Sequence, residues 1–299
     1  MTWDDLIGDE VASRDVSLAP VTTYKLGGPA DLFLEALDLV TLERCAAALD
    51  ADPVPVLVLG RGSNLLVSDA GFRGVVIRLG GSFSEFTVDA EGVVQAGGAA
   101  SLPRLARAAA AAGRGGLEWC VGVPGSVGGA VRQNAGCFGS EVVDVLVDAD
   151  VVSLVAGDTT TRSAADLDLA YRHSNVTATD VVTSARFFTT VTDPAAAAEE
   201  MRRITRWRRD NQPGGTLNAG SVFKNPPGDA AGAIIDRLGL KGFSIGKVRV
   251  SPRHANFIEA DHGATATDVH ALIAAVQATV RERGGIDLEP EIQFVGFED

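Results

Sequence analysis

The chain has 299 residues, 46% of them hydrophobic and 22% charged, so it can bury a substantial core in two or three compact parts. Its net charge of −13 argues against broad binding to nucleic acid or to anionic membranes. The acidic N-terminal segment and the absence of any apolar run near the length of a membrane span predict a cytoplasmic protein without membrane contact.

The sequence pattern predicts an α+β fold in three segments. In residues 1–80, strands are expected at 54–59, 65–67 and 75–79 around a helix over 39–49. In residues 81–192, a hairpin candidate over 86–97 precedes a helix over 101–112, and strand-like runs follow at 142–147, 149–155 and 181–188. Residues 193–299 carry helices at 194–210, 230–238 and 267–283 and strands at 247–250, 256–259 and 291–295. The last of these strands can return to the preceding segments.

The positive charge is concentrated in one part of this acidic chain. Between Met201 and His254 there are eleven Lys and Arg against three Asp and Glu, a local charge of about +8. A solvated basic helix accounts for the five arginines at 202–209. The bias continues to Arg253, however, which favours a pocket for a small polyanion such as a nucleotide diphosphate.

A first glycine-rich loop, Gly60–Leu65, follows a predicted strand and leads into another. It does not precede a helix as a G-x-G-x-x-G dinucleotide loop does, and it lacks the Lys-Ser/Thr pair of a P-loop. A tight turn that needs glycine explains this loop when it is taken alone.

A second loop, Gly122–Ala130, has four glycines and one proline in nine residues. Such a composition lets successive backbone N–H groups turn toward one anionic point. Two loops of this kind, both expected on β-structure, could bind one extended diphosphate from opposite sides. The alternative is that they are two unrelated turns.

Three further clusters combine reactive side chains: Tyr171–Ser174, Asn218–Pro226 and Leu288–Glu291. Ser221 lacks a G-x-S-x-G setting and a histidine partner, so we expect a proton donor rather than a triad nucleophile. Taken singly, Ser221 could be a serine in a β-turn, Arg172 a surface arginine and Glu291 a carboxylate at the start of a strand, without a catalytic role. The four histidines show no ligand spacing, and no metal is predicted. The cysteines Cys45, Cys120 and Cys137 form no Cys-x-x-Cys and are expected to be reduced, mostly buried thiols without an assigned role.

Eight motifs in fixed order together resemble the UDP-N-acetylenolpyruvoylglucosamine reductase family, over about Thr22 to Gly296. They are TYKLGGPAD, LGRGSNLLVSDAGFRG, GLEWCVGVPGSVGGAVRQNAG, AYRHS, NAGSVFKNP, LGLKG, SPRHANFI and LEPEIQFVG. The resemblance implies an FAD-binding fold of the PCMH or vanillyl-alcohol-oxidase type, with FAD-binding subdomains at 1–80 and 81–192 and a substrate-binding domain at 193–299. It also implies NADPH as hydride donor and the enolpyruvyl ether of UDP-N-acetylglucosamine as the small-molecule substrate, which is reduced to UDP-N-acetylmuramate for the cell wall.

The resemblance assigns roles to individual residues. Arg172 matches the arginine that stabilises the enolate, Ser221 the proton donor and Glu291 the second active-site acid. The matching FAD-binding residues are Gly60, Arg61, Gly62, Ser63, Asn64, Leu65, Gly122, Pro124, Gly125, Ser126, Gly128, Gly129 and Ala130. Those that match substrate contacts are Arg209, Lys224, Asn225 and His254.

Some features separate this chain from other members. Lys25 stands where arginine is common, Gln133 where methionine is frequent, and Arg209 near a usual lysine. The chain is short after Arg172 and has no inserted tyrosine-bearing loop, which indicates the second, loop-lacking type. Neither glycine-rich loop contains His or Cys, so FAD is expected to be noncovalent. We expect a monomer or a weak oligomer. Two alternatives are another flavin-dependent sugar or alcohol oxidoreductase of the same fold and a non-catalytic flavin-binding module.

Overall fold

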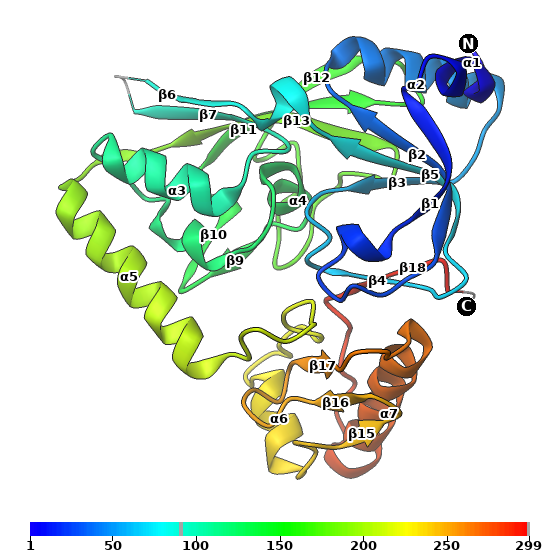
Figure 1. The fold of residues 1–299 in the computed structure, drawn as a ribbon. Coiled ribbons are helices and arrows are strands. Elements are labelled where there is room, and N and C mark those ends of the chain that lie inside the picture. The colour runs from blue at the N-terminus through cyan, green and yellow to red at the C-terminus, as the bar shows by residue number, and fades with distance from the viewer. Residues whose placement is uncertain (90–91, 298–299) are drawn as a thin grey trace. The chain divides into compact units, whose positions relative to one another are not determined.

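The protein is described by a computed structural model that covers residues 1–89 and 92–297. It contains two compact units, each assembled from segments that are distant in the sequence (Figure 1). The first unit comprises Met1–Asp15, Leu32–Arg61 and Gly74–Trp207, and the second comprises Val16–Asp31, Gly62–Arg73 and Arg208–Asp299.

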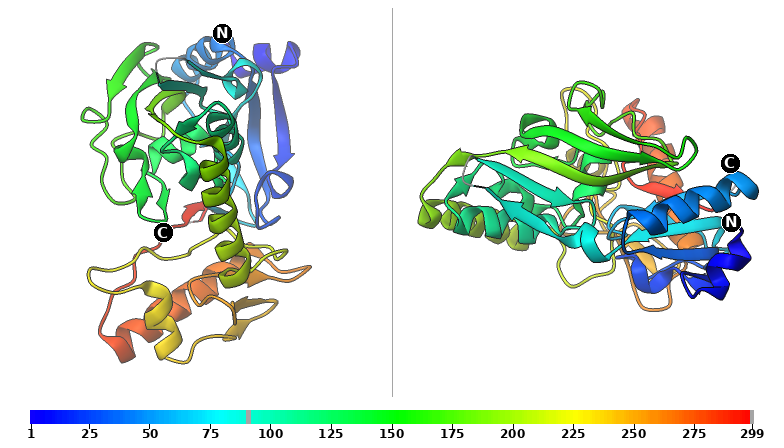
Figure 2. Two further views of the ribbon diagram at one scale, coloured as in Figure 1. Left: turned by 90° about the vertical axis from the view of Figure 1, so that its left-hand side faces the viewer. Right: turned by 90° about the horizontal axis from the view of Figure 1, so that it is seen from above.

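The N-terminal sheet has the strand order β1-β2-β5-β3, in which β3 and β5 are parallel. Its strands are β1 (Ala12–Ser17), β2 (Pro29–Ala36), β5 (Phe72–Leu79) and β3 (Val56–Leu59). Helix α2 (Leu39–Ala51) packs its buried side on this sheet together with the short helix α1 (Trp3–Gly8) (Figure 2). Asp38 caps α2, since its carboxylate accepts a hydrogen bond from the Thr41 N–H at 2.9 Å. The predicted helix at 39–49 is therefore confirmed.

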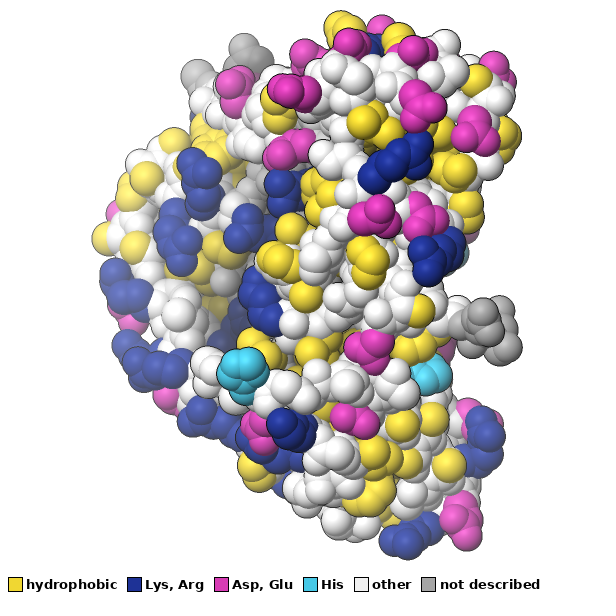
Figure 3. Space-filling model, turned by 45° about the vertical axis from the view of Figure 1, so that its right-hand side comes forward, with side chains coloured by type: hydrophobic (Ala, Val, Ile, Leu, Met, Phe, Trp, Pro, Cys, Tyr) yellow, Lys and Arg dark blue, Asp and Glu magenta, His cyan; other side chains and the backbone are white. Residues whose placement is uncertain are grey.

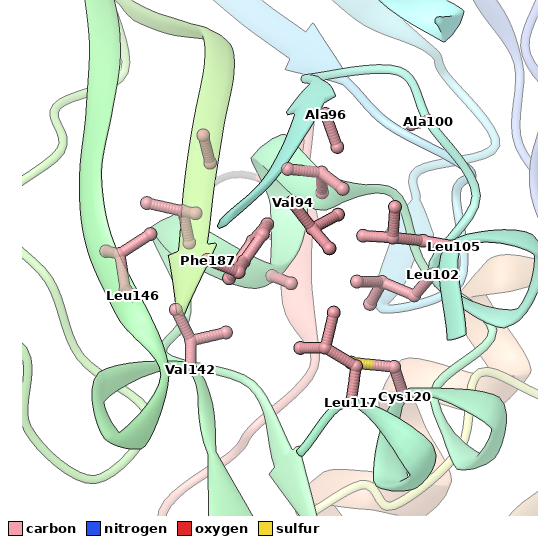
Figure 4. Close-up of a cluster of buried hydrophobic side chains, with 14 of the residues drawn as sticks. Val94, Ala96, Ala100, Leu102, Leu105, Leu117, Cys120, Val142, Leu146 and Phe187 are labelled. Atoms are coloured by element: carbon pink, nitrogen blue, oxygen red, sulfur yellow. The ribbon is translucent and has the colours of Figure 1, made fainter. Parts of the chain in front are cut away.

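A five-stranded antiparallel sheet with the order β12-β11-β13-β7-β6 lies in the first unit. Its strands are β12 (Thr159–Ser163), β11 (Leu146–Ser153), β13 (Asp180–Phe188), β7 (Val93–Gly97) and β6 (Phe86–Val88). Helix α3 (Leu102–Ala111) covers this sheet. Figure 4 shows Val94 and Phe187 between Leu146 on one side and Leu102 and Leu105 of α3 on the other. The turn residues 90–91 of the predicted hairpin lie outside the described residues.

The predicted strand over 142–147 is wrong. Residues Val142–Asp144 form a 3₁₀ turn, closed by reciprocal hydrogen bonds between the Glu141 and Asp144 side chains and each other's backbone N–H. One continuous strand, β11, then begins at Leu146 and accommodates two register shifts against β13. The valine-rich pattern does not distinguish a buried turn from a buried strand at this length.

Several short elements and two further helices lie outside these two sheets. Two-stranded ribbons pair β8 (Arg114–Gly115) with β14 (Thr190–Val191) and β9 (Gly136–Cys137) with β10 (Ser140–Glu141). Helix α4 spans Val127–Arg132, and α5 spans Pro194–Asn211. Further 3₁₀ turns lie at Ala19–Val21, Gly81–Ser84 and Glu118–Gly122.

The second unit contains an antiparallel three-stranded sheet, β15 (Ser244–Ile245), β16 (Val248–Val250) and β17 (Ile258–Ala260), with α6 (Ala231–Arg237) and α7 (Ala266–Gly284). These elements share one buried cluster, which includes Ile235, Leu272 and Val276. Helix α7 is capped at its C-terminal end by Gly285, whose φ of +67° favours glycine. The helix predicted over 267–283 is thus confirmed.

The terminal strand β18 (Gln293–Val295) pairs in parallel with β4 (Leu65–Val67), also within the second unit. In the described part of the chain, no helix has both the length and the apolar character needed to cross a membrane.

Among the cysteines, Cys45 and Cys120 are buried and Cys137 is half-buried, and all three are free thiols. Burial raises the pKa of the Cys45 thiol to about 12, so this side chain is an inert part of the core.

Candidate active site

The two glycine-rich loops meet at Gly60 and Ser126, both in the first unit. A Cβ atom on Gly60 would lie 2.7 Å from the Ser126 Oγ, so a side chain at position 60 requires Ser126 to move. Gly62 is constrained separately in the second unit, where it has a φ of +61° and a Cβ atom would lie 2.2 Å from the Val21 carbonyl oxygen. Gly62 is therefore required by a close approach of the backbone, whereas the approach at Gly60 is to a side chain.

The second loop leads directly into helix α4, so the expectation that it is built on β-structure alone is wrong. The Ser126 Oγ caps α4 and accepts the Gly129 N–H at 3.4 Å. The loop is also tied to the sheet, because Gly128 N–H donates to the Gly98 carbonyl at 2.8 Å and Val127 N–H to Ala100 at 3.0 Å. The segment Val-Gly-Gly-Ala has low helix propensity, and only the capping serine signals the helix in the sequence.

Several backbone N–H groups in these loops are available to a ligand. Within the described residues, the N–H groups that donate no hydrogen bond to the protein include five, those of Arg61, Gly62, Ser63, Gly125 and Ser126. A Cβ atom on Gly125 would have no neighbour closer than 3.7 Å. Packing within the chain therefore does not require glycine at position 125, and its bare backbone leaves space for a bound group. Uncommitted N–H groups at glycine-rich turns are the donor set that an anionic diphosphate needs.

Arg172 occupies a two-residue turn of the first unit. Ala170 and His173 exchange backbone hydrogen bonds of 3.2 and 3.0 Å, and Arg172 has a φ of +54°. An arginine in this left-handed conformation is held there by its surroundings. Its Nη2 donates to the Gly136 carbonyl at 3.1 Å, and its guanidinium lies over the Tyr171 ring.

A carboxylate orients the same arginine. The Glu141 Oε1 lies 3.6 Å from the Arg172 Nη1, and the other oxygen accepts from the Nδ2 of Asn134, a fully buried residue, at 3.0 Å. These contacts therefore fix the guanidinium, whose side chain is only 16% exposed.

Ser221 and Glu291 lie on two segments of the second unit that run beside each other. Glu291 N–H donates to the Val222 carbonyl at 2.7 Å, and Lys224 N–H donates to the Glu289 carbonyl at 2.9 Å. Ser221 is half-buried, and its hydroxyl has no hydrogen-bond partner within the described residues. The structure thus brings these two predicted site residues together.

Asn256 holds the Ser221 segment from the opposite side. Its side-chain oxygen accepts the Phe223 N–H at 3.0 Å, its Nδ2 donates to the Phe223 carbonyl at 2.8 Å, and its carbonyl accepts the Val222 N–H at 2.8 Å. Asn256, Glu141 and Asn134 were not predicted as site residues. Each lies in or beside a motif, but an amide or carboxylate that only holds another site residue in place has no characteristic spacing.

The predicted substrate contacts have structural partners in the protein. Lys224 pairs with Glu289 at 2.5 Å, and Arg209, with a side chain 74% exposed, pairs with Asp210 at 3.1 Å. The Asn225 Oδ1 accepts the Ala231 N–H at 3.0 Å at the start of α6. Burial lowers the pKa of His254, whose Nδ1 accepts the Asn256 N–H at 3.3 Å, so this ring is neutral at pH 7.

The basic segment is less positive in the structure than in the sequence. Arg202 and Arg203 pair with Glu199 and Glu200, acids just outside the counted segment, which supports the solvated-helix interpretation for these two arginines. Other pairs of this segment are Arg237 with Asp229, Lys241 with Asp236, and Arg249 with Glu259 and Asp261. Figure 3 shows Lys and Arg side chains beside Asp and Glu on the face in view. Within the described chain, Arg206 and Arg253 form no ion pair.

Known proteins resemble this chain along its whole length. Residues 31–162 match the family described as an FAD binding domain, and residues 212–295 match the C-terminal domain of UDP-N-acetylenolpyruvoylglucosamine reductase. The reductase of Phenylobacterium zucineum is 43% identical over 99% of both chains, and that of Erythrobacter litoralis is 42% identical over 95% of this chain and 87% of its own. The crystal structure of the Thermus caldophilus enzyme superposes with a TM-score of 0.83 at 34% identity, covering 95% of this chain and 98% of that one. The chain belongs to the UDP-N-acetylenolpyruvoylglucosamine reductase family.

Proposed function

We propose that this chain is an FAD-containing, NADPH-dependent UDP-N-acetylmuramate dehydrogenase. It reduces the enolpyruvyl ether of UDP-N-acetylglucosamine to UDP-N-acetylmuramate, a precursor of peptidoglycan. The observation that carries the proposal is the match to curated reductases over nearly the full chain, together with the presence of Arg172, Ser221 and Glu291.

The loops at 60–65 and 122–130 are proposed to hold the pyrophosphate and flavin of FAD. The five backbone N–H groups without protein acceptors and the bare backbone at Gly125 fit such a ligand. Neither loop contains His or Cys, which supports noncovalent binding. When bound, FAD supplies hydride chemistry, taking hydride from NADPH and passing it to the terminal methylene carbon of the substrate.

Three side chains are proposed to handle the charge and the proton. As electrons move toward the carboxylate-bearing end of the enolpyruvyl group, the Arg172 guanidinium stabilises the growing negative charge, a contribution of about 3 kcal/mol for one well-placed donor. The Ser221 Oγ then donates its proton to the carbon that bears the carboxylate. Glu291, beside Ser221 through the Val222 hydrogen bond, is the second acid of the site.

Substrate binding is assigned to Arg209, Lys224, Asn225 and His254, with 193–299 as the substrate-binding domain and 1–80 and 81–192 as cofactor-binding subdomains. We also propose the loop-lacking type of the family and a monomer or weak oligomer. Only residues 173–179 separate Arg172 from β13, and the Ser174 hydroxyl ties this segment to the Arg132 carbonyl at 2.6 Å, which supports a short connection without an inserted loop.

The test is NADPH oxidation by the purified protein, with and without the enolpyruvyl substrate. The protein should be yellow, acid should release the flavin, and NADPH oxidation should depend on the substrate. Rapid turnover with dioxygen and a sugar or alcohol instead would support a same-fold oxidase. Bound flavin without turnover would support a non-catalytic module.

A further inference from the structure

The peptide groups on either side of Glu291 are held by hydrogen bonds to two other segments. Its N–H donates to the Val222 carbonyl at 2.7 Å, on the segment that carries Ser221. Its carbonyl accepts a hydrogen bond from the Asn64 Nδ2 at 2.9 Å. Asn64 belongs to the first glycine-rich loop, although 227 residues separate it from Glu291. All of these residues lie in the second unit.

Asn64 also begins the pairing of β4 with β18. The Gln293 N–H donates to the Asn64 carbonyl at 3.0 Å, and the parallel register then pairs Gln293 with Leu65 and Val295 with Val67. The side-chain hydrogen bond of Asn64 therefore extends this pairing to Glu291, the proposed acid.

We propose that Asn64 is a positioning residue for Glu291, so that the first glycine-rich loop sets the orientation of the acid as well as contacting the cofactor. This inference rests on the proposed function, because it assigns Glu291 to the reaction of the reduced enzyme with the enolpyruvyl substrate. The direction of the Glu291 side chain follows from its backbone, which Asn64 and Val222 hold from two sides. A displacement of about 1 Å at a reacting group can slow a reaction by about 10²-fold.

The test uses Asn64→Ala and Asn64→Asp in the full-length holoenzyme at FAD concentrations that saturate each variant. Alanine removes the whole amide, whereas aspartate keeps the size but replaces the donor with a carboxylate that faces the Glu291 carbonyl. Reoxidation by the enolpyruvyl substrate should slow by about 10- to 100-fold, clearly more than flavin reduction by NADPH slows in the same variant. Gln293→Ala is the matched control, because it shortens a side chain on the same strand and retains both backbone bonds.

A double-mutant cycle with Glu291→Gln separates positioning from a general loss of structure. If Asn64 acts through Glu291, Asn64→Ala should slow reoxidation much less in the Glu291→Gln background than in wild type. Fully additive effects, or equal slowing of both half-reactions, would overturn the inference. So would failure of both Asn64 variants to retain FAD, because the side chain would then serve the cofactor directly. If Glu291→Gln alone leaves reoxidation unchanged, it is the proposed role of Glu291 that fails.

Discussion

Replacing Asn256 with alanine should destabilise the protein substantially, because this amide pairs with both backbone polar groups of a buried residue, Phe223. Phe223 is 2% exposed, and its N–H and carbonyl lose partners at 3.0 and 2.8 Å. An unsatisfied buried polar group costs about 1–3 kcal/mol, so two predict a loss of about 2–6 kcal/mol in the free energy of unfolding. Water that enters the vacated volume would bring the value toward the lower end of this range.

The assay is guanidinium unfolding of the apoprotein, with Asn218→Ala as the matched control. Asn218 is half-buried, and among the described residues its side-chain hydrogen bonds reach only its near neighbours Thr216 and Gly220, so its loss should cost about 1 kcal/mol. Asn256→Asp should be at least as damaging as Asn256→Ala at pH 7, because a carboxylate would face the Phe223 carbonyl. If Asn256→Ala unfolds at the same denaturant concentration as the control, the buried-pair reasoning is wrong.

Three further predictions concern the loops, the start of α7 and the basic helix. Gly125→Ala should leave the unfolding of the apoprotein unchanged but weaken FAD binding in a titration. Gly60→Ala should also destabilise the apoprotein, because its Cβ atom would lie 2.7 Å from the Ser126 Oγ. Unchanged FAD affinity in both variants would contradict the assignment of the loops to FAD. The Asp69 carboxylate accepts hydrogen bonds from the N–H groups of the first two residues of α7 at 2.9 Å each. Partial burial raises the pKa of this carboxyl, but its hydrogen bonds outweigh burial and the pKa is lowered. Asp69→Asn should therefore lower the free energy of unfolding by about 1 kcal/mol at pH 7. Because the folded pKa is the lower one, the difference should shrink as pH falls below 3.8, and a constant difference would argue against the carboxylate. Arg209→Glu should raise the KM for the UDP-sugar more than it slows flavin reduction, and an unchanged KM would make Arg209 a solvated surface residue.

Local chemistry explains which parts of the fold the sequence predicts. The helix at 39–49 follows a capping aspartate, and the helix at 267–283 ends before a glycine in the left-handed conformation. In both cases the signals lie within a few residues of the element they limit.

The parts that the sequence does not predict depend on distant partners or on ambiguous composition. The hydrogen bond between Asn64 and Glu291 joins residues 227 positions apart, and neither motif contains a sequence signal for this contact. Helix α4 forms from valine, glycine and alanine because Gly128 packs against Gly98. The local charge of about +8 overstates the basic surface, because acids outside the counted segment, such as Glu199 and Glu259, neutralise part of it.

Stopped-flow measurement of the two half-reactions in Ser221→Ala tests the proposed mechanism most directly. The Ser221 proton is needed only after hydride has left the reduced flavin, so flavin reduction by NADPH should match wild type. Reoxidation by the enolpyruvyl substrate should fall by about 10²–10⁴-fold, and Ser221→Cys should recover part of that loss because a thiol can also donate a proton. An equal fall in both half-reactions, or no fall in either, would contradict the assignment of Ser221 as the proton donor.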